Sequence, residues 1–317
     1  MPQTGIIADP QVKLHDPGPY HPEQPARFDA ILNRLEASGV LRTLVRLESR
    51  PASEDDLALV HTRDYIALVQ REIACGCSEL STGDTSIGQG SLEAAYLAAG
   101  GCLAAVDAVL QGAVSNAFCL VRPPGHHASA ARGMGFCIFN NIALAARYAQ
   151  RKYGIEHVLI ADWDVHHGNG TQDIFYEDGS VLFFSTHQSP WYPFTGAASE
   201  QGEGAGLGAT INCPLPAGSG RREIEAAFTN RLLPAAKAFH PDLILISAGF
   251  DSRQGDPLGQ FLLTDEDFRD LTELLLALAA ECCDHKLISV LEGGYNLSGL
   301  ASAAEAHLRA LSQHPRT

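Results

Sequence analysis

Short uninterrupted apolar runs recur through the middle and C-terminal parts of the chain, and each ends in glycine, proline or polar residues. Continuous Val, Ile and Leu runs are typical of strands buried on both faces, whereas strict alternation indicates a strand with one solvent-facing side. The runs are AFCLV (117–121), HVLIADWDV (157–165), SVLFFST (180–186), DLILISAGF (242–250) and KLISVLEGG (286–294). They predict buried strands of a mostly parallel sheet.

Helical patterns lie before and between these runs. They cover residues 25–39, 91–112, 135–154 and 264–283, and Ser91 is the expected N-cap of the second helix. Strands that alternate with helices predict an α/β fold with three layers, in which helices cover both faces of one sheet. This is the architecture in which we expect a site at the carboxyl ends of the strands.

The composition is that of an ordinary globular protein: of 317 residues, 45% are hydrophobic and 19% are charged. No linker, charge block or repeat divides the chain, so we expect a single domain over residues 1–317. The formal net charge of -15 argues against nucleic acid as a partner, because nucleic acids recruit a basic face. The sequence is compatible with both a monomer and a homo-oligomer.

Targeting and redox signals are weak throughout the sequence. The first residues, MPQTGIIADP, contain no basic region followed by an apolar one, and no uninterrupted apolar run is long enough to span a bilayer. The eight cysteines form no CxxC pair, which argues against a zinc ribbon or a disulfide framework. We therefore expect a cytoplasmic protein without a membrane partner.

Nearly every chemically useful side chain follows the end of an apolar run. In open α/β sheets, ligands bind in the crevice beyond the carboxyl ends of the strands. The five runs are followed by RPPGHH, DVHHGNG, THQSPWYP, DSRQGDP and YN. The sequence thus predicts one site to which several strand ends contribute.

The stretch DWDVHHGNGTQ (162–172) is rich in metal-binding side chains. With a strand period of two, Asp164 and His166 lie on one face, while His167 lies on the other and is expected to be structural. A third ligand must come from another strand end, and Asp251 is the best placed. Asp, His and Asp with an open position suit a cation such as zinc.

Two adjacent histidines follow the Pro-Pro-Gly turn, and a tyrosine follows the last strand. Adjacent side chains point in different directions, so His126 and His127 are not expected to bind one ion together. A neutral imidazole near the metal can act as a general base, and Asp162 and Asn169 are available to orient both rings. Tyr295, after two glycines, can donate a hydrogen bond to a developing oxyanion.

Taken together and in order, these segments resemble the histone deacetylase and acetylpolyamine amidohydrolase superfamily, which has the arginase/deacetylase fold. The resemblance is carried by RPPGHHA, GFCIFNN, DWDVHHGNGT, SAGFDS with GDPLG, and LEGGYN, with weaker similarity in HPEQPAR (21–27) and VHTRDYI (60–66). Asn169 and the GDPLG segment are closer to the class II and bacterial branch than to class I.

The resemblance implies a zinc-dependent deacetylase that hydrolyses an acyl-lysine amide. Zinc would be held by Asp164, His166 and Asp251. His127, paired with Asn169, would accept and donate the proton, and His126, paired with Asp162, would assist by charge and hydrogen bonding. Tyr295 would polarise the scissile carbonyl.

The resemblance also implies a channel and a second ion. Gly135 and Phe136, with Tyr192 opposite, would line a narrow channel for the stem of an acylated lysine. A structural potassium ion would be surrounded by main-chain oxygens of Asp162, Asp164 and His166 together with Ser185 and Thr186.

Three other functions have to be weighed against this one. An arginase-type ureohydrolase would need a second metal and more aspartates near Asp251, where only Asp256 follows. An acetylpolyamine deacetylase of the class II type carries a glutamate after the GDP turn, where this chain has Leu258, although bacterial polyamine enzymes select their substrate differently. A catalytically silent acyl-ligand-binding protein would have lost a ligand, His127 or Tyr295, and none is lost.

Overall fold

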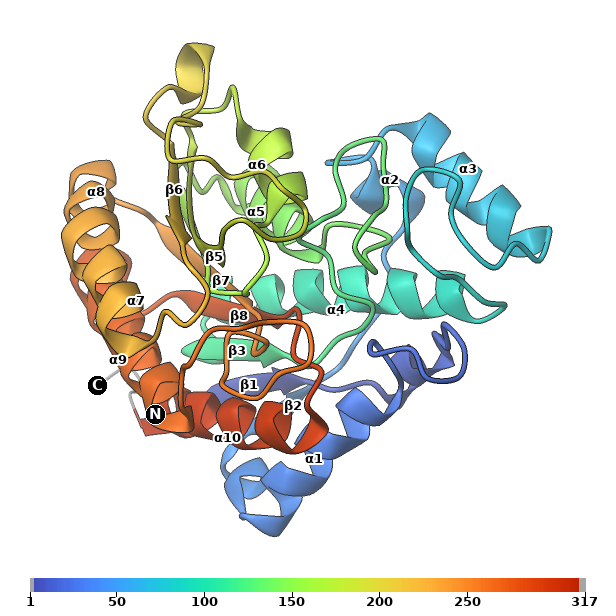
Figure 1. The fold of residues 1–317 in the computed structure, drawn as a ribbon, viewed down its shortest axis with the longest axis horizontal. Coiled ribbons are helices and arrows are strands. Elements are labelled where there is room, and N and C mark those ends of the chain that lie inside the picture. Colours follow the sequence, from blue (N-terminus) through green and yellow to red (C-terminus); the bar gives the residue numbers. More distant parts are fainter. Residues whose placement is uncertain (1–2, 314–317) are drawn as a thin grey trace.

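The computed structural model describes residues 3–313, and its centre is an eight-stranded sheet whose paired strands all run parallel (Figure 1). The strand order is β2-β1-β3-β8-β7-β4-β5-β6. The strands are β1 (Thr4–Ile7), β2 (Val45–Leu47), β3 (Asn116–Cys119), β4 (Val158–Asp162), β5 (Val181–Gln188), β6 (Thr210–Leu215), β7 (Leu243–Ala248) and β8 (Leu287–Leu291). The ends of the predicted domain, residues 1–2 and 314–317, lie outside the described residues.

Helices cover both faces of the sheet, which confirms the predicted three-layer α/β fold. They are α1 (Ala26–Ala37), α2 (Glu54–Leu57), α3 (Arg63–Ala74), α4 (Ser91–Leu110), α5 (Asn141–Tyr153), α6 (Asn169–Phe175), α7 (Arg221–Ala227), α8 (Leu233–Phe239), α9 (Asp265–Cys282) and α10 (Leu297–Gln313). One apolar core packs mainly α1, α7, α9 and α10 against the sheet, and the other packs α3, α4 and α5. All eight cysteines are free.

Each of the five predicted apolar runs overlaps a strand, namely β3, β4, β5, β7 and β8. The apolar pattern missed β1, β2 and β6. The first two have only four and three residues, and β6 mixes polar residues with Pro214. These segments form strands because a neighbouring strand pairs with them, which a local pattern does not encode.

The third predicted helix, 135–154, is wrong in its first turns, because α5 begins only at Asn141. Gly135 and Phe136 have φ angles of +56° and +68°, and this left-handed conformation is incompatible with a right-handed helix. Asn140 caps α5 with its side chain. Gly135 and Phe136 are therefore free to line the site.

The predicted N-cap Ser91 is also wrong. Gly90 occupies that position, and Ser91 is the first residue of α4. The Ser91 hydroxyl accepts a hydrogen bond from the Gly88 amide and lies 2.8 Å from His15 Nδ1. The Ser91 side chain therefore stabilises the turn that precedes α4 rather than the first turn of the helix.

Helix α4 is, within residues 3–313, the one helix long and apolar enough by length and composition to cross a membrane. Of the apolar window of α4, 67% is buried in the fold, and the helix packs against α5 and β3. Buried core helices can have the same length and apolar composition, so the burial of α4 says more about its place in the fold than its composition does.

Gly100 in α4 is expected to tolerate no side chain. A Cβ there would lie 1.9 Å from the Arg50 carbonyl oxygen and 2.4 Å from the Ala52 nitrogen. Helix propensity alone favours alanine by about 1 kcal/mol, but this overlap should make Gly100→Ala destabilising by about 1–3 kcal/mol. Urea denaturation measures the free energy of unfolding, and Ala108→Gly reports the propensity contribution in the same helix. A Gly100→Ala protein more stable than the wild type would contradict the packing argument.

Candidate metal centre and active site

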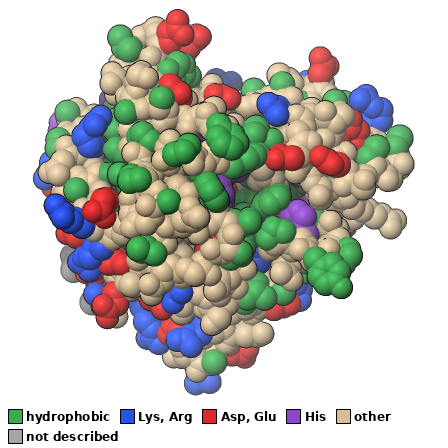
Figure 2. Space-filling model, viewed as in Figure 1, with side chains coloured by type: hydrophobic (Ala, Val, Ile, Leu, Met, Phe, Trp, Pro, Cys, Tyr) green, Lys and Arg blue, Asp and Glu red, His purple; other side chains and the backbone are tan. Residues whose placement is uncertain are grey.

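The strand order brings the predicted site segments together at one edge of the sheet. Strands β3, β8, β7, β4 and β5 are consecutive neighbours, and their carboxyl ends lead into the segments that carry the candidate residues. Figure 2 shows a hollow on this face, bordered by hydrophobic side chains and with histidine inside it. The prediction that several strand ends contribute to one site thus has a direct geometric basis.

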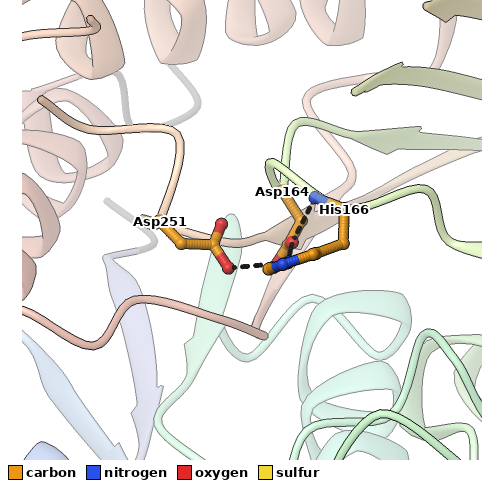
Figure 3. A group of neighbouring side chains, drawn as sticks. All are labelled: Asp164, His166 and Asp251. Atoms are coloured by element: carbon orange, nitrogen blue, oxygen red, sulfur yellow. Dashed lines mark hydrogen bonds and ion pairs between the residues drawn. The ribbon is translucent and has the colours of Figure 1, made fainter. Parts of the chain in front are cut away.

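Three predicted metal ligands converge beneath this edge (Figure 3). Asp164 and His166 follow β4, and Asp251 follows β7, the strand paired with β4. His166 Nδ1 lies 3.0 Å from Asp164 Oδ1 and 3.2 Å from Asp251 Oδ2. All three residues are buried.

These spacings fit a single divalent cation. Two ligand atoms about 2.0 Å from a tetrahedral zinc ion are separated by about 3.3 Å, close to the distances between His166 and the two carboxylates. Asp251 Oδ2 is buried and accepts no hydrogen bond with good geometry from a described residue. The other carboxylate oxygens are held in place, because Val165 N donates to Asp251 Oδ1 and Gly293 N donates to Asp164 Oδ2.

The glycines beside the carboxylates are needed for space. A Cβ at Gly249 would lie 2.0 Å from Asp164 Oδ2, and a Cβ at Gly293 would lie 2.0 Å from Asp251 Oδ2. The structure shows that a side chain at either position would displace a ligand.

The electrostatics of the metal-free chain show that these carboxylates need a positive partner. Burial raises the pKa of Asp251 to about 7, and the neighbouring Asp164 charge acts in the same direction. Burial opposes a charge on His166 too, but Asp164 and Asp251 outweigh it and raise the pKa of His166 to about 10. A bound cation would replace this proton, so metal binding should release it.

The histidine pair lies beside the metal ligands, and each ring has its predicted partner. His126 Nδ1 lies 3.0 Å from Asp162 Oδ2, and His127 Nδ1 lies 2.8 Å from Asn169 Oδ1. The two rings are 4.0 Å apart between centroids. The carboxylate and the amide therefore fix which nitrogen of each ring faces away from the site.

The two imidazoles have opposite protonation preferences. Burial lowers the pKa of His126, but Asp164 and Asp162 outweigh it and raise it to about 10. Burial, followed by the charges of His126 and His166, holds the pKa of His127 well below its ordinary value. His127 is thus the neutral ring, able to accept a proton.

A pocket of about 230 Å³ opens from the metal ligands to the surface. Its lining contains the predicted channel residues Gly135, Phe136 and Tyr192 and also Leu258, together with Asp84 and Trp191, to which the sequence analysis assigned no role. The lining residues are Asp84, His127, Gly135, Phe136, His166, Trp191, Tyr192, Leu258 and Tyr295.

Asp84 and Trp191 connect the pocket walls. Asp84 Oδ1 accepts hydrogen bonds from Gly135 N at 2.8 Å and from the Tyr192 hydroxyl at 3.1 Å. Trp191 Nε1 donates to the Leu258 carbonyl at 2.9 Å. Trp191 was visible in the segment after β5, but Asp84 lies in a loop remote from any apolar run and gave no sequence signal.

Tyr295 is held at the inner end of the pocket. Its backbone nitrogen donates to Asp256 Oδ2 at 2.7 Å, and its ring lies 5.0 Å from the Arg27 guanidinium. Burial raises the pKa of the Tyr295 phenol well above its ordinary value, so the hydroxyl keeps its proton and can donate.

Asp256 anchors the backbone rather than binding metal, since its side chain also accepts from the Leu258 and Asn296 amides. In the described part of the chain, Asp164, His166 and Asp251 form the one group of side chains arranged to hold a metal ion. No second metal cluster of the arginase type accompanies it in that part of the chain.

His167, the second histidine of DWDVHHGNGTQ (162–172), lies outside the metal cluster. Its Nδ1 lies 2.8 Å from Thr195 Oγ1, and its Nε2 lies 3.0 Å from Gln172 Oε1. Ser185 and Thr186, two of the residues named for the potassium site, are buried on β5, and Thr186 Oγ1 has no hydrogen-bond partner among the described residues. Potassium binding stays a prediction of the resemblance.

Comparison with known proteins gives consistent matches. The model of the histone deacetylase domain family matches residues 21–311. Human polyamine deacetylase HDAC10 is 45% identical over 292 residues, which cover 89% of this chain but 43% of that protein. A probable deacetylase of Archaeoglobus fulgidus is 40% identical over 298 residues, covering 93% of this chain and 82% of that protein.

A further relative and a solved structure extend the match. Histone deacetylase 10, chloroplastic, of Oryza sativa subsp. japonica is 42% identical over 311 residues, covering 93% of this chain and 70% of that protein. The crystal structure of the HDA15 HD domain superimposes with a TM-score of 0.94 at 39% identity, covering 100% of this chain and 90% of that one.

Proposed function

Since the chain belongs to the histone deacetylase domain family, we propose that it is a zinc-dependent deacetylase acting on the acylated ε-amine of lysine in peptides or proteins. The observation that carries the proposal is the convergence of the metal ligands, a neutral histidine and a tyrosine hydroxyl on one pocket. The chain spans less than half the length of the human relative, so the activity of that whole protein is not transferred.

The reaction follows from the placement of these groups. Zinc held by Asp164, His166 and Asp251 would supply Lewis-acid polarisation of the amide and lower the pKa of a nearby water. His127 accepts the proton of the attacking water and passes it to the nitrogen as the C–N bond breaks. Tyr295 donates to the carbonyl oxygen as negative charge develops there. The products are a carboxylate such as acetate and a free amine.

The shape of the pocket supports an acyl-lysine substrate. Phe136 and Tyr192 form apolar walls, and Gly135 offers no side chain to narrow the space between them. Such walls suit the aliphatic stem of a lysine, which gains by burial of its methylene groups. Leu258 near the mouth provides no carboxylate for a second amine.

An acetylated polyamine is the second candidate substrate. A relative that is 45% identical bears the printed name polyamine deacetylase, and the Asp84 carboxylate lines this pocket. However, one Asp84 oxygen is already bonded to Gly135 and Tyr192, and the Leu258 side chain is apolar. The acyl-lysine substrate is therefore preferred.

A comparison of kcat/KM decides between these substrates. Acetyl-lysine peptides, longer acyl-lysine peptides and acetylated polyamines are assayed with the zinc content quantified, and the highest value is expected for an acyl-lysine peptide. A higher value for the polyamines would favour the second candidate. No acetate release from either class by a zinc-loaded protein would favour a silent acyl-ligand-binding protein.

Leu258→Glu should shift the preference toward polyamines. A carboxylate at this half-buried position gains a charge-assisted contact with a distant ammonium group, which is worth about 1.5–3 kcal/mol. We expect the ratio of kcat/KM for acetylspermidine to that for an acetyl-lysine peptide to rise at least about tenfold. Leu258→Gln separates the charge from the change in shape and should alter this ratio little. An unchanged ratio for Leu258→Glu would show that Leu258 does not control substrate choice.

A further inference from the structure

Glu292 is a buried carboxylate between the loops that carry the reacting groups. It follows β8, and its Oε2 accepts hydrogen bonds from Gly125 N at 2.6 Å and from His126 N at 3.1 Å. The side chain forms no ion pair within residues 3–313, and the residue has no exposed surface. Burial of this carboxylate costs free energy that the nearby His126 charge offsets only in part, so its hydrogen bonds to the histidine turn need an explanation.

The loop that contains Glu292 is fixed to the rest of the site. The Glu292 carbonyl accepts from Arg27 Nη2 at 2.5 Å, and Gly293 N donates to the metal ligand Asp164 at 2.8 Å. Tyr295 lies two residues after Gly293 in the same loop. The Glu292 side chain extends this rigid loop to the turn that carries the histidine pair.

The histidine turn has no free space on its other side. A Cβ at Gly125 would lie 2.5 Å from Asn141 N and 2.9 Å from the Phe139 carbonyl. The turn is therefore held between the start of α5 and the carboxylate of Glu292. Loss of the carboxylate would leave two buried amides without acceptors and the turn without its contact to β8.

We infer that Glu292 is a positioning residue that holds the His126–His127 turn in register with the loop carrying Tyr295. The inference rests on the proposed function insofar as it concerns proton transfer. This contact explains how the two histidines, which follow β3, and Tyr295, which follows β8, keep a fixed relative position. Small displacements at such a site are costly, since a shift of about 1 Å can reduce turnover by about 10²-fold.

The role needs an acceptor rather than a charge. Burial raises the pKa of Glu292 to about 7, and Oε1 accepts no hydrogen bond from the described residues. A proton can thus reside on Oε1 while Oε2 still accepts from Gly125 and His126. Glutamine has the same shape and offers the same acceptor, so it should replace Glu292.

The test compares Glu292→Gln with Glu292→Met, which fills a similar volume without an acceptor. We expect Glu292→Gln to stay within about threefold of the wild-type kcat, because the acceptor is kept. Glu292→Met should lower kcat by about 10²-fold while KM and zinc content stay unchanged. Glu305→Ala serves as the control. Glu305 is another carboxylate of low exposure, lies on α10 outside the pocket and pairs with Arg34, so its removal should leave kcat unaltered.

Hydrogen–deuterium exchange provides a readout that does not depend on activity. The segment containing Gly125 and His126 should exchange faster in Glu292→Met than in the wild type, but not in Glu292→Gln. Glu292→Ala takes the place of the methionine variant if that protein does not fold. Should the wild type prove inactive, the proposed function fails, and the exchange data alone decide on Glu292.

Three results would overturn the inference. An equal loss of kcat in the glutamine and methionine variants would show that the charge is what matters. Full kcat in the methionine variant would show that the turn holds without Glu292. Loss of zinc from Glu292→Met would show that Glu292 supports the metal ligands rather than the histidine turn.

Discussion

Replacing Asp251 with alanine is expected to remove zinc binding and to lower kcat/KM by at least about 10³-fold, the largest effect that we predict. The two remaining candidate ligands, Asp164 and His166, both come from the segment after β4, and Asp251 is the one ligand that reaches the cation from β7. Without it, the cation keeps too few protein ligands for a stable tetrahedral site.

The fold itself should survive this substitution. In the metal-free chain the Asp251 carboxyl has its pKa raised to about 7 by burial, so its charge is a cost rather than a source of stability. Zinc should raise the melting temperature of the wild type but not that of Asp251→Ala, because a ligand stabilises only the state that binds it.

Zinc per chain, kcat/KM and the melting temperature with and without zinc are the measurements. Asp173→Ala is a suitable control, since Asp173 lies on α6 outside the metal cluster and should keep zinc and activity. One zinc ion per chain and wild-type turnover in Asp251→Ala would contradict the assigned ligand set.

Tyr295→Phe is expected to lower kcat by about 10²–10³-fold while zinc content stays unchanged. The Tyr295 hydroxyl makes no hydrogen bond with a described residue, so its removal leaves no protein group unpaired. The ring contacts with Phe136 and Arg27 do not involve the hydroxyl and remain in phenylalanine. The loss should therefore appear in turnover and not in the free energy of unfolding.

A second tyrosine gives the opposite pattern and serves as the control. The Tyr65 hydroxyl donates to the Ile138 carbonyl at 2.7 Å in a buried position outside the pocket. Tyr65→Phe should cost about 1 kcal/mol of unfolding free energy with kcat close to that of the wild type. If Tyr295→Phe retains wild-type kcat, another group must donate to the oxyanion.

The sequence located the site through residues at the ends of strands. Asp164 lies at the end of an apolar run, and His166, Asp251 and the histidine pair follow such runs. The structure brings all of them together. The partners Asp162 and Asn169 also occupy their expected places. The sequence did not single out Asp84, which lines the pocket, or Glu292, which accepts from the histidine turn, because no local pattern distinguishes a loop carboxylate or the end of a strand segment.

The sequence by itself determined the elements, because the periodicity of apolar side chains and the residues that end each run are local properties. It therefore indicated the α/β class, five of the strands, and which side chains are at their carboxyl ends. Those features require no knowledge of which strand lies beside which.

Only the tertiary structure decided how the carboxyl ends of the strands are arranged relative to one another. Strand β8, the last in the chain, pairs between β3 and β7, and this places Tyr295 and Glu292 between the histidine turn and Asp251. Strand order depends on packing between segments far apart in sequence, and so do the Glu292 contacts with Gly125 and His126. The physical reason is that the free energy of strand pairing depends on both segments, so the sequence of one segment alone does not predict its pairing partner.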